Sequence, residues 1–413
     1  MSIDAYYSHP ETLQRLHEGP LGVHVDLYAE RLLKEGYSRQ RVWRDLRLFY
    51  DFSQWLAAKQ LGLHDLDERI IDRYMRFRGR YRRPFPSGSP VLLRLLGVLR
   101  DINAVAPRPP AVLSPLEQIV EDFYRHLAEQ CGLARVSVIR HKPVLRQFLA
   151  EQCGGGRRYL SRLTAADITA FVQRHAHDQS PKSAQSMCWT LRSFLRYLLY
   201  RGEICADLTG SVPTVRTWAL ASLPSYLHPR QVQKVLATCD RHGPVGRRDY
   251  AILLLLARMG LRANEIRLLT LEDIDWGAGQ LMVQGKGGQG APMPLPVAVG
   301  AAIADYLQHG RPRSDDRHVF LRHPAPHRSF ASSRAISTLA ETALLRAGFH
   351  GLPHKGAHLF RHSLATQLLR TGASLTEIGQ VLRHQKHDTT RIYAKVDIGA
   401  LRALALSWPG GAR

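Results

Sequence analysis

The sequence predicts a mainly α-helical protein that carries one small β-sheet. Three observations lead to this expectation. Apolar residues recur at spacings of three and four through most of the 413-residue chain, as amphipathic helices require. Proline-rich stretches separate helical blocks, because proline interrupts a helix. One Gly-rich segment with a short apolar run on either side is typical of a β-hairpin.

The proline-rich stretches divide the chain into three expected domains. Residues 106–115 (APRPPAVLSP) contain four prolines, and a second break with prolines lies within 212–229. The expected domains are therefore 1–108, 113–215 and 225–413, a number that suits the length of the chain.

The first two domains are similar to one another when residue n is placed beside residue n+96. The matched pairs are Gly36 with Gly132, Arg44 with Arg140, and Phe52 with Phe148, among others. Each domain is expected to hold four to five helices, ending in 91–102 and 184–200, and Thr164 is expected to cap a helix. We interpret the pair as a duplication, with chance similarity between small helical domains as the alternative.

The third domain is expected to be mixed. Apolar spacing predicts helices at 229–239, 248–258, 264–269, 297–307, 334–346, 358–370, 375–382 and 389–393. Two short strands are expected at 280–284 and 291–295. The strands flank GKGGQG, which is expected to form the hairpin tip.

The charge balance predicts a polyanionic partner. The chain has 57 Lys and Arg against 35 Asp and Glu, a net charge of +22, and +12 of it falls on residues 221–413. Nucleic acid is the first candidate and an anionic membrane the second, while a generally basic surface is the alternative without a partner.

Cysteine usage and hydropathy predict a cytoplasmic protein that does not enter a membrane. The five cysteines are widely spaced and form no C-x-x-C pair, which favours reduced thiols. The N-terminus lacks a basic-then-apolar signal, and the longest apolar stretch, around 251–257, is too short to span a bilayer.

Two cations in the third domain are candidates for phosphate binding. Arg262 follows Gly260 at the expected start of a helix, where its guanidinium and the helix dipole both favour an anion. Glu265 is expected to hold that turn by pairing with the arginine or with a backbone amide. Lys286, at the hairpin tip, can reach into a groove and protonate a leaving oxygen. The alternatives are a surface arginine and a solvated loop lysine.

The segment G-A-H-L-F-R-H carries a more specific pattern. A helix places His358 and Arg361, three residues apart, on one face. There Arg361 can neutralise a phosphate while His358 donates or accepts a proton. His362 is expected to face elsewhere and pack.

A tyrosine near the end of the chain is a candidate nucleophile. Tyr393 stands nine residues after His384. Its hydroxyl is a poor nucleophile at neutral pH, but a cationic site favours the charge that develops when it attacks a phosphodiester. The alternative is a half-buried aromatic residue on a helix.

The residue pattern argues against a metal or a cofactor. His354, His358 and His362 recur at four-residue spacing, yet no Glu follows the first histidine of a pair, and Arg361 would repel a dication. No carboxylate cluster suits two-metal phosphoryl transfer, and GKGGQG lacks the spacing of a P-loop. We therefore expect neither.

Taken in order, the motifs G-L-R-A-N-E-I, G-K-G, H-L-F-R-H, L-R-H and T-T-R-I-Y strongly resemble the tyrosine recombinase, or phage integrase, family across about 113–408. The resemblance implies a helical SAM-like core-binding domain, then a catalytic domain, closing on DNA as a C-shaped clamp.

The resemblance also implies roles for the six candidate residues. Arg262 and Arg361 resemble the phosphate-clamping arginines, and Lys286 resembles the hairpin lysine that protonates the leaving 5′ oxygen. His358 resembles the general acid/base, His384 the second imidazole, and Tyr393 the nucleophile that forms a 3′-phosphotyrosine.

The chain departs from the family pattern in a few places. Arg383 stands where a glycine commonly precedes the second histidine, and it adds a candidate phosphate contact. Residues 1–108 are extra, and are expected to extend the DNA footprint or mediate protein contacts. The run 76–83 (RFRGRYRR) suits backbone binding, with a solvated basic loop as the alternative. The tail after Tyr393 is expected to pack on a neighbouring protomer or on its own domain.

The resulting prediction is an enzyme: a site-specific DNA recombinase of the integrase or transposase type that uses no metal or ATP. Its partners are expected to be double-stranded DNA and three further protomers, in a tetramer of this chain or with other recombinases. The alternatives are a catalytically silent DNA-binding accessory protein and a relaxing enzyme like type IB topoisomerases. The target site and biological role stay open.

Overall fold

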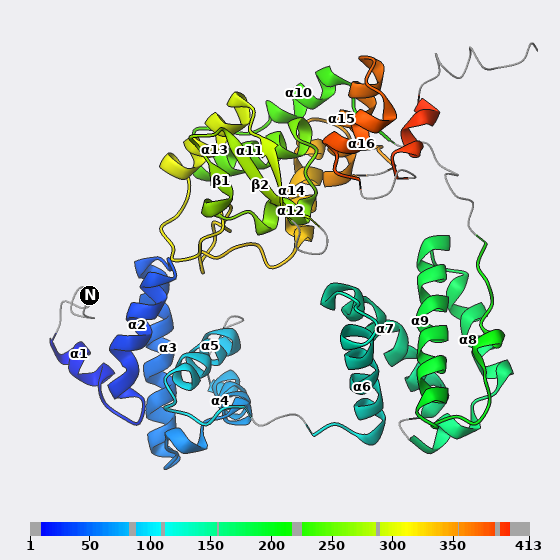
Figure 1. The fold of residues 1–413 in the computed structure, drawn as a ribbon. Coiled ribbons are helices and arrows are strands. Elements are labelled where there is room, and N and C mark those ends of the chain that lie inside the picture. The colour runs from blue at the N-terminus through cyan, green and yellow to red at the C-terminus, as the bar shows by residue number, and fades with distance from the viewer. Residues whose placement is uncertain are drawn as a thin grey trace, which may run out of the picture. The chain divides into compact units, whose positions relative to one another are not determined.

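The computed structural model describes residues 10–81, 88–108, 112–154, 157–216, 225–285, 290–353, 355–384 and 389–396. The chain separates into two compact units, of which one holds 1–108 with 222–413 and the other holds 109–221 (Figure 1). The described parts are mainly helical with one three-stranded sheet, as the sequence predicts. The division into three domains stays a prediction.

The described residues of the first part of the chain form five α-helices. They are α1 (Pro10–Leu16), α2 (Val25–Lys34), α3 (Arg39–Ala58), α4 (Glu68–Tyr81) and α5 (Gly88–Asp101). Their apolar faces meet in a core that runs in sequence from Leu16 to Val105. Ser38 begins α3, because its side chain accepts a hydrogen bond from the backbone of Arg41 at 3.4 Å. The expected helix at 91–102 is the body of α5.

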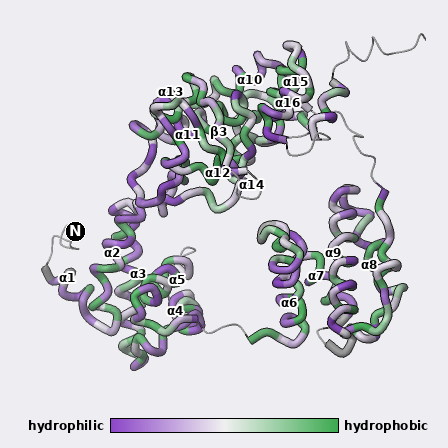
Figure 2. The backbone as a smooth tube through the Cα atoms, in the orientation of Figure 1, coloured by the Kyte–Doolittle hydropathy of each residue, from purple (hydrophilic) through white to green (hydrophobic). Residues whose placement is uncertain are grey.

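In the second unit, the residues that the structure describes form four α-helices around their own core. They are α6 (Pro115–Glu129), α7 (Arg135–Cys153), α8 (Ala165–Ala176) and α9 (Pro181–Tyr200). Thr164 caps α8 as expected: its hydroxyl accepts from the Asp167 backbone at 3.3 Å, and Asp167 accepts from the Thr164 backbone at 3.0 Å. Along these helices, as along those of 1–108, hydrophobic and hydrophilic segments alternate (Figure 2). This alternation is what a helix with one buried face requires.

The third part of the chain surrounds a small sheet with helices. The helices are α10 (Pro229–Leu236), α11 (Pro244–Arg258), α12 (Ala263–Leu268), α13 (Val297–His309), α14 (Ser333–Arg346), α15 (Ala357–Arg370) and α16 (Leu375–Val381). The antiparallel strands are β1 (Ile274–Asp275), β2 (Gln280–Gln284) and β3 (Gly290–Pro294). The predicted hairpin strands are thus β2 and β3, and β1 is an addition that the sequence analysis did not predict.

Helix α11 is the centre of the core in this part. Its residues from Ala251 to Ala257 are buried, and helices α13 and α15 pack against it. A core helix that is apolar on every side explains why this stretch is the longest apolar run of the chain. No helix in the described part of the chain is both long and apolar enough to span a bilayer.

One expected helix has a different form. The segment predicted as a helix at 389–393 is the 3-10 helix η8 (Arg391–Val396), which packs against α15 and α16. The run 76–83 is also not a loop: residues 76–81 are the last turns of α4, and 82–83 lie outside the described residues. The expected tail contacts after residue 396 lie outside them as well.

Candidate nucleic-acid site

The candidate site is built where three turns meet around the guanidinium of Arg361. Helix α15 carries Arg361, which is 4% exposed. Its two terminal nitrogens donate to the backbone carbonyls of Gly260 and Leu382. Gly260 precedes α12 and Leu382 follows α16, so one buried side chain ties both turns to α15. Burial, and then the charge of Arg262, lower the pKa of Arg361 to about 10.

Gly260 allows the turn before α12 to lie close to α15 and to the end of α16. Its φ of +61° lies in the left-handed region, which favours glycine. A Cβ at this position would lie 2.7 Å from Cδ2 of Leu382 and 3.0 Å from Cδ2 of Leu364. The glycine therefore lets the turn before Arg262 close onto α15 and α16.

Arg262 begins α12 and is held by Glu265. The Arg262 backbone N–H donates to Oε2 of Glu265 at 2.8 Å, and its Nη1 donates to Oε1 at 2.7 Å. Both expected modes of pairing are thus present. The Glu265 side chain is 5% exposed, whereas that of Arg262 is 37% exposed. The carboxylate is the buried anchor, and the Arg262 guanidinium is the group that reaches solvent.

Arg383 also pairs with Glu265, which differs from the expected phosphate contact. Its Nη2 donates to Oε2 of Glu265 at 2.7 Å, and its Nη1 contacts the sulfur of Met293 on β3. Its φ is +54°, a left-handed conformation that explains why a glycine suits this place. The Arg383 side chain is 15% exposed, so it links α12, the β-hairpin and the turn before His384 instead of facing solvent.

His384 lies beside these cations as a neutral imidazole. Its Nδ1 is 2.8 Å from the hydroxyl of Thr390, which is itself buried. Burial, followed by the charges of Arg361 and Arg262, lowers the pKa of His384 to about 4. The ring is therefore uncharged at neutral pH, when it can donate a hydrogen bond without adding repulsion to the cationic cluster.

Tyr393 is buried in the same site. It is 1% exposed and packs with Ala365, Ile378 and Leu382. Burial raises the pKa of Tyr393 to about 12, although the charges of Arg361 and Arg262 act in the opposite direction. The expectation that this tyrosine lies among arginines and histidines agrees with the structure, whereas the alternative expected a half-buried residue and Tyr393 is almost fully buried.

His362 contacts Tyr393. Nδ1 of His362 lies 2.9 Å from the Tyr393 hydroxyl, and the two ring centres are 5.7 Å apart. The expectation that His362 packs is confirmed, but the expectation that it faces away from the other candidate residues is wrong, because α15 directs it towards Tyr393 on η8. His358 is exposed, with its ring centre 6.5 Å from that of His362, whereas Arg361, three residues later on α15, is 4% exposed. The sequence signal for this contact is the position of His362 directly after Arg361.

Lys286 lies outside the described residues, but strands β2 and β3 are described up to residues 284 and 290. The structure thus brings together Arg262, Arg361, His384 and Tyr393.

Among the residues described, no three His, Cys, Asp or Glu side chains form a group that could hold a metal ion. Cys131, Cys188, Cys205 and Cys239 are free thiols.

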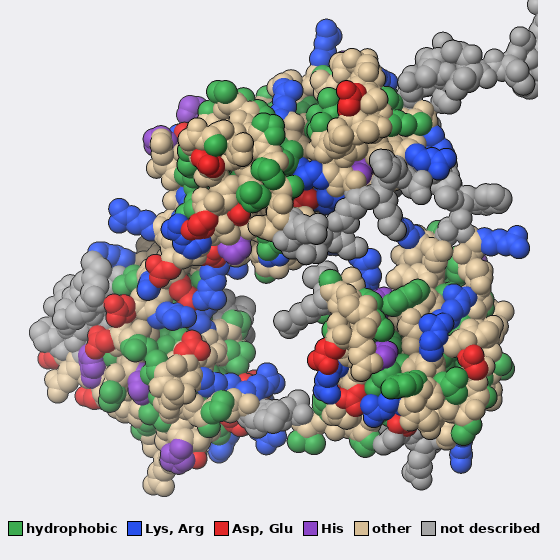
Figure 3. All heavy atoms as spheres, viewed as in Figure 1, with side chains coloured by type: hydrophobic (Ala, Val, Ile, Leu, Met, Phe, Trp, Pro, Cys, Tyr) green, Lys and Arg blue, Asp and Glu red, His purple; other side chains and the backbone are tan. Residues whose placement is uncertain are grey.

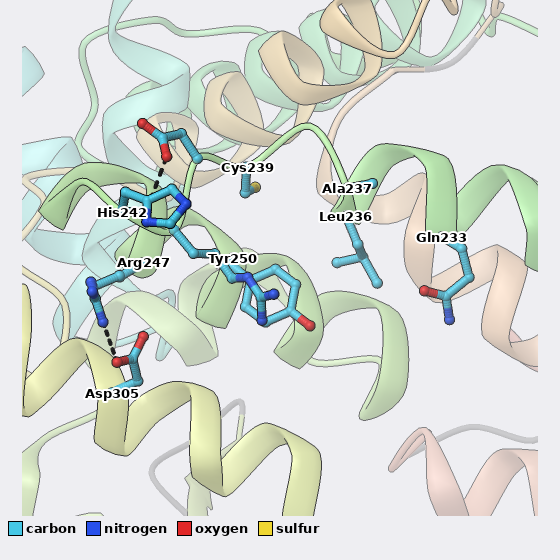
Figure 4. A pocket seen from close by; sticks show the side chains of 10 residues that line it. Gln233, Leu236, Ala237, Cys239, His242, Arg247, Tyr250 and Asp305 are labelled. Carbon is cyan, nitrogen blue, oxygen red and sulfur yellow. Dashed lines mark hydrogen bonds and ion pairs between the residues drawn. The ribbon is translucent and has the colours of Figure 1, made fainter.

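A separate pocket of about 630 Å³ lies on α10, α11 and α13. In this pocket, Arg247 pairs with Asp305 and the buried Cys239 lies nearby (Figure 4). None of the candidate residues that the structure describes, Arg262, His358, Arg361, His384 and Tyr393, lines it. On the face that Figure 3 shows, Lys and Arg side chains lie on both units, with Asp and Glu side chains among them.

Two family models match the chain. The model described as "Phage integrase family" matches residues 225–399, and the one described as "Phage integrase, N-terminal SAM-like domain" matches residues 120–202.

Curated relatives match most or nearly all of the chain. The candidate integrase/recombinase y4rA of Sinorhizobium fredii is 43% identical over 403 residues, which are 97% of this chain and 98% of the relative. A second one, y4rF of the same organism, is 31% identical over 425 residues, with 99% and 96% covered. Tyrosine recombinase XerC of Oceanobacillus iheyensis is 28% identical over 299 residues, with 70% and 95% covered.

Solved structures share the fold at low identity. XerH recombinase bound to palindromic difH substrate has a TM-score of 0.57 at 18% identity, covering 82% of this chain and 94% of that one. A lambda integrase dimer bound to a COC′ core site has a TM-score of 0.51 at 16% identity, covering 67% and 94%.

Proposed function

The chain belongs to the phage integrase, or tyrosine recombinase, family, and we propose that Tyr393 is the residue through which it cleaves DNA. As a member it is a site-specific recombinase, an enzyme that breaks and rejoins strands of double-stranded DNA. The assignment of roles to individual side chains is our proposal. The observation that carries it is the hydrogen bond between Tyr393 and His362 beside the buried Arg361.

In the proposed reaction, the Tyr393 hydroxyl oxygen attacks the phosphorus of the scissile phosphodiester. The bond from phosphorus to the 5′ oxygen breaks, which leaves a 3′-phosphotyrosine and a free 5′ hydroxyl. His362 accepts the proton of Tyr393, and Lys286, by family resemblance, donates a proton to the 5′ oxygen. Rejoining is the reverse reaction with the 5′ hydroxyl of a second strand, so the bond energy is kept and no ATP is used.

The remaining candidates would stabilise the phosphate. Arg262 and Arg361 neutralise the charge on its non-bridging oxygens, and the neutral His384 donates a hydrogen bond to one of them. His358, at the exposed start of α15, is the family-implied acid/base and lies one turn from His362. We propose that the two histidines divide this work, with His362 at the tyrosine and His358 towards the DNA.

We further propose that the enzyme works in the cytoplasm as a tetramer on two duplexes, with the SAM-like unit and the catalytic part closing on DNA as a clamp. Integration, excision, transposition and dimer resolution all use this chemistry. The candidate integrases among the relatives favour a mobile element.

The test is a nicked suicide duplex that carries the recombination site. The full-length protein should become covalently linked to its DNA, and Tyr393→Phe should form no adduct while binding the duplex with unchanged affinity. An undiminished adduct in Tyr393→Phe would overturn the nucleophile assignment. Two results separate the alternatives: an accessory protein forms no adduct on the nicked duplex, and a relaxing enzyme forms one but also relaxes supercoiled plasmids that lack the site.

A further inference from the structure

The helices of 1–108 repeat those of the second unit at a nearly constant offset. Helix α3 (Arg39–Ala58) shifted by 96 residues coincides with α7 (Arg135–Cys153). Helix α4 (Glu68–Tyr81) shifted by 97 residues begins where α8 (Ala165–Ala176) begins. The duplication predicted from sequence therefore extends to the order and bounds of the helices.

The buried side chains repeat as well. Each of the following pairs is buried in both members: Tyr28 and Tyr124, Val42 and Val138, Phe52 and Phe148, Ile71 and Ile168, Tyr74 and Phe171, Leu95 and Phe194, Leu99 and Leu198. Because core positions of equal register set the orientation of a helix, α3 presents the same face to solvent as α7 does.

The exposed faces of α3 and α7 also correspond. Trp43 is 44% exposed, and Ile139, its counterpart at offset 96, is 51% exposed. Arg44 and its counterpart Arg140 are both exposed. The second unit, which contains α7, matches the SAM-like domain of the family. The two faces thus share one exposed apolar residue and one exposed arginine, while Arg47 corresponds to Pro143, so the second arginine is a feature of α3 alone.

The exposed side of the first turns of α3 carries two arginines beside a tryptophan. We call the surface formed by Gln40, Trp43, Arg44 and Arg47 the α3 face; these residues are all exposed. The Arg47 guanidinium lies 5.9 Å from the centre of the Trp43 ring. The one carboxylate within 39–50, Asp45, is fully buried, and its oxygens lie 3.0 Å from Arg41 and 3.4 Å from Arg94.

Helix α4 has more arginines but a less favourable charge pattern. The exposed Asp72 stands among its exposed arginines. Glu68, at its start, lies 2.8 Å from Arg100. A phosphate near α4 would therefore meet the exposed Asp72 and the half-buried Glu68. On α3, Asp51 stands one turn after Arg47, but it is half-buried and lies 3.9 Å from Arg78.

We propose that the α3 face binds the phosphate backbone of duplex DNA, which gives this recombinase a second helical DNA-binding module in residues 1–108. The proposal rests on the proposed function of the chain as a DNA recombinase. A cationic stripe without exposed carboxylates is complementary to a polyanion, and one exposed tryptophan is too small an apolar area for a protein interface of ordinary size. The footprint of one protomer is then longer than 113–215 and 225–413 alone would produce.

The test uses full-length protein with Arg44→Ala/Arg47→Ala. Its control is Arg15→Ala/Lys59→Ala, which removes the same charge from exposed positions outside the α3 face. The readouts are the salt dependence of the dissociation constant for duplex DNA and the length of the nuclease footprint. Each lost phosphate contact lowers the slope of log affinity against log salt by about 0.9. We expect the slope to fall by about 2 and the footprint to shorten in the α3 variant alone.

Equal slopes and footprints in the two double variants would overturn the proposal. So would unchanged DNA binding with weaker association between protein copies, since that result makes the α3 face a protein interface. The covalent adduct on a nicked duplex, measured at saturating protein, should form in both variants. If the wild-type chain forms no adduct, the proposed function fails, while the comparison of slopes still decides the α3 face.

Discussion

His362 and Tyr393 are joined by a hydrogen bond of 2.9 Å between an imidazole nitrogen and a phenol oxygen that is buried from solvent. The pKa of Tyr393 is raised to about 12, mainly by burial, so the hydroxyl keeps its proton at neutral pH. The nucleophile thus depends on a neighbouring base when it attacks, and His362 is the base within hydrogen-bonding distance.

Replacement of His362 should therefore slow strand cleavage. We expect His362→Ala to lower the single-turnover rate of adduct formation about 10²- to 10⁴-fold with little change in DNA affinity. His362→Gln keeps a hydrogen-bonding group but lacks the basicity of histidine. It should therefore unfold at the wild-type denaturant concentration, unlike a destabilised His362→Ala, while its rate of adduct formation stays low. Cleavage at the wild-type rate in His362→Ala would show that His362 only packs.

Much of this site can be predicted from the sequence because the features involved are local. Arg262 and Glu265 are three residues apart, so the helix start alone brings them together. The same holds for Thr164 with Asp167, and the helices themselves follow from apolar spacing. Strand β1, with two residues, is too short to have a periodic pattern.

The rest depends on tertiary contacts that spacing cannot reveal. His362 and Tyr393 are 31 residues apart, and which face of α15 meets η8 depends on how α16 packs between them. Arg383 meets Glu265 across 118 residues. A motif shows which residue types are present, but the long-range path of the chain decides which of them touch.

Arg383 combines an unfavourable backbone conformation with a favourable ion pair. Arg383→Gly loses the pair with Glu265 but relieves the positive φ, whereas Arg383→Ala loses the pair and keeps the strained backbone. We expect the glycine variant to be more stable than the alanine variant by about 1 kcal/mol. Denaturant unfolding of both variants measures this difference, and an alanine variant of equal or greater stability would contradict it.

Cleavage should not require a divalent metal. Arg262, Arg361 and the neutral His384 supply the positive charge and the hydrogen bonds that a metal ion would otherwise provide to the phosphate. We expect adduct formation on the nicked duplex to proceed at the same rate in excess EDTA. Loss of the adduct with EDTA, and its rescue by magnesium or zinc, would contradict this mechanism.

The stability of the DNA-free protein should depend on the protonation of His384. The pKa of this ring is about 4 in the folded chain and 6.5 in its reference state, with burial as the main cause. Between these values the unfolded chain binds a proton that the folded chain does not. The free energy of unfolding therefore falls as the pH falls from about 6.5 to about 4, by up to about 1.4 kcal/mol per pH unit for one proton.

His384→Asn should flatten this dependence, because an amide can replace Nδ1 as the partner of Thr390 and does not titrate in this range. The difference between variant and wild type is read between pH 6.5 and 4.5, above the range where most carboxylates take up protons. His177→Asn, which alters a ring that is 91% exposed in the second unit, is the matched control and should follow the wild-type curve. If His384→Asn also follows that curve, folding does not lower the pKa of His384, and the claim that burial holds this ring neutral in the site is wrong.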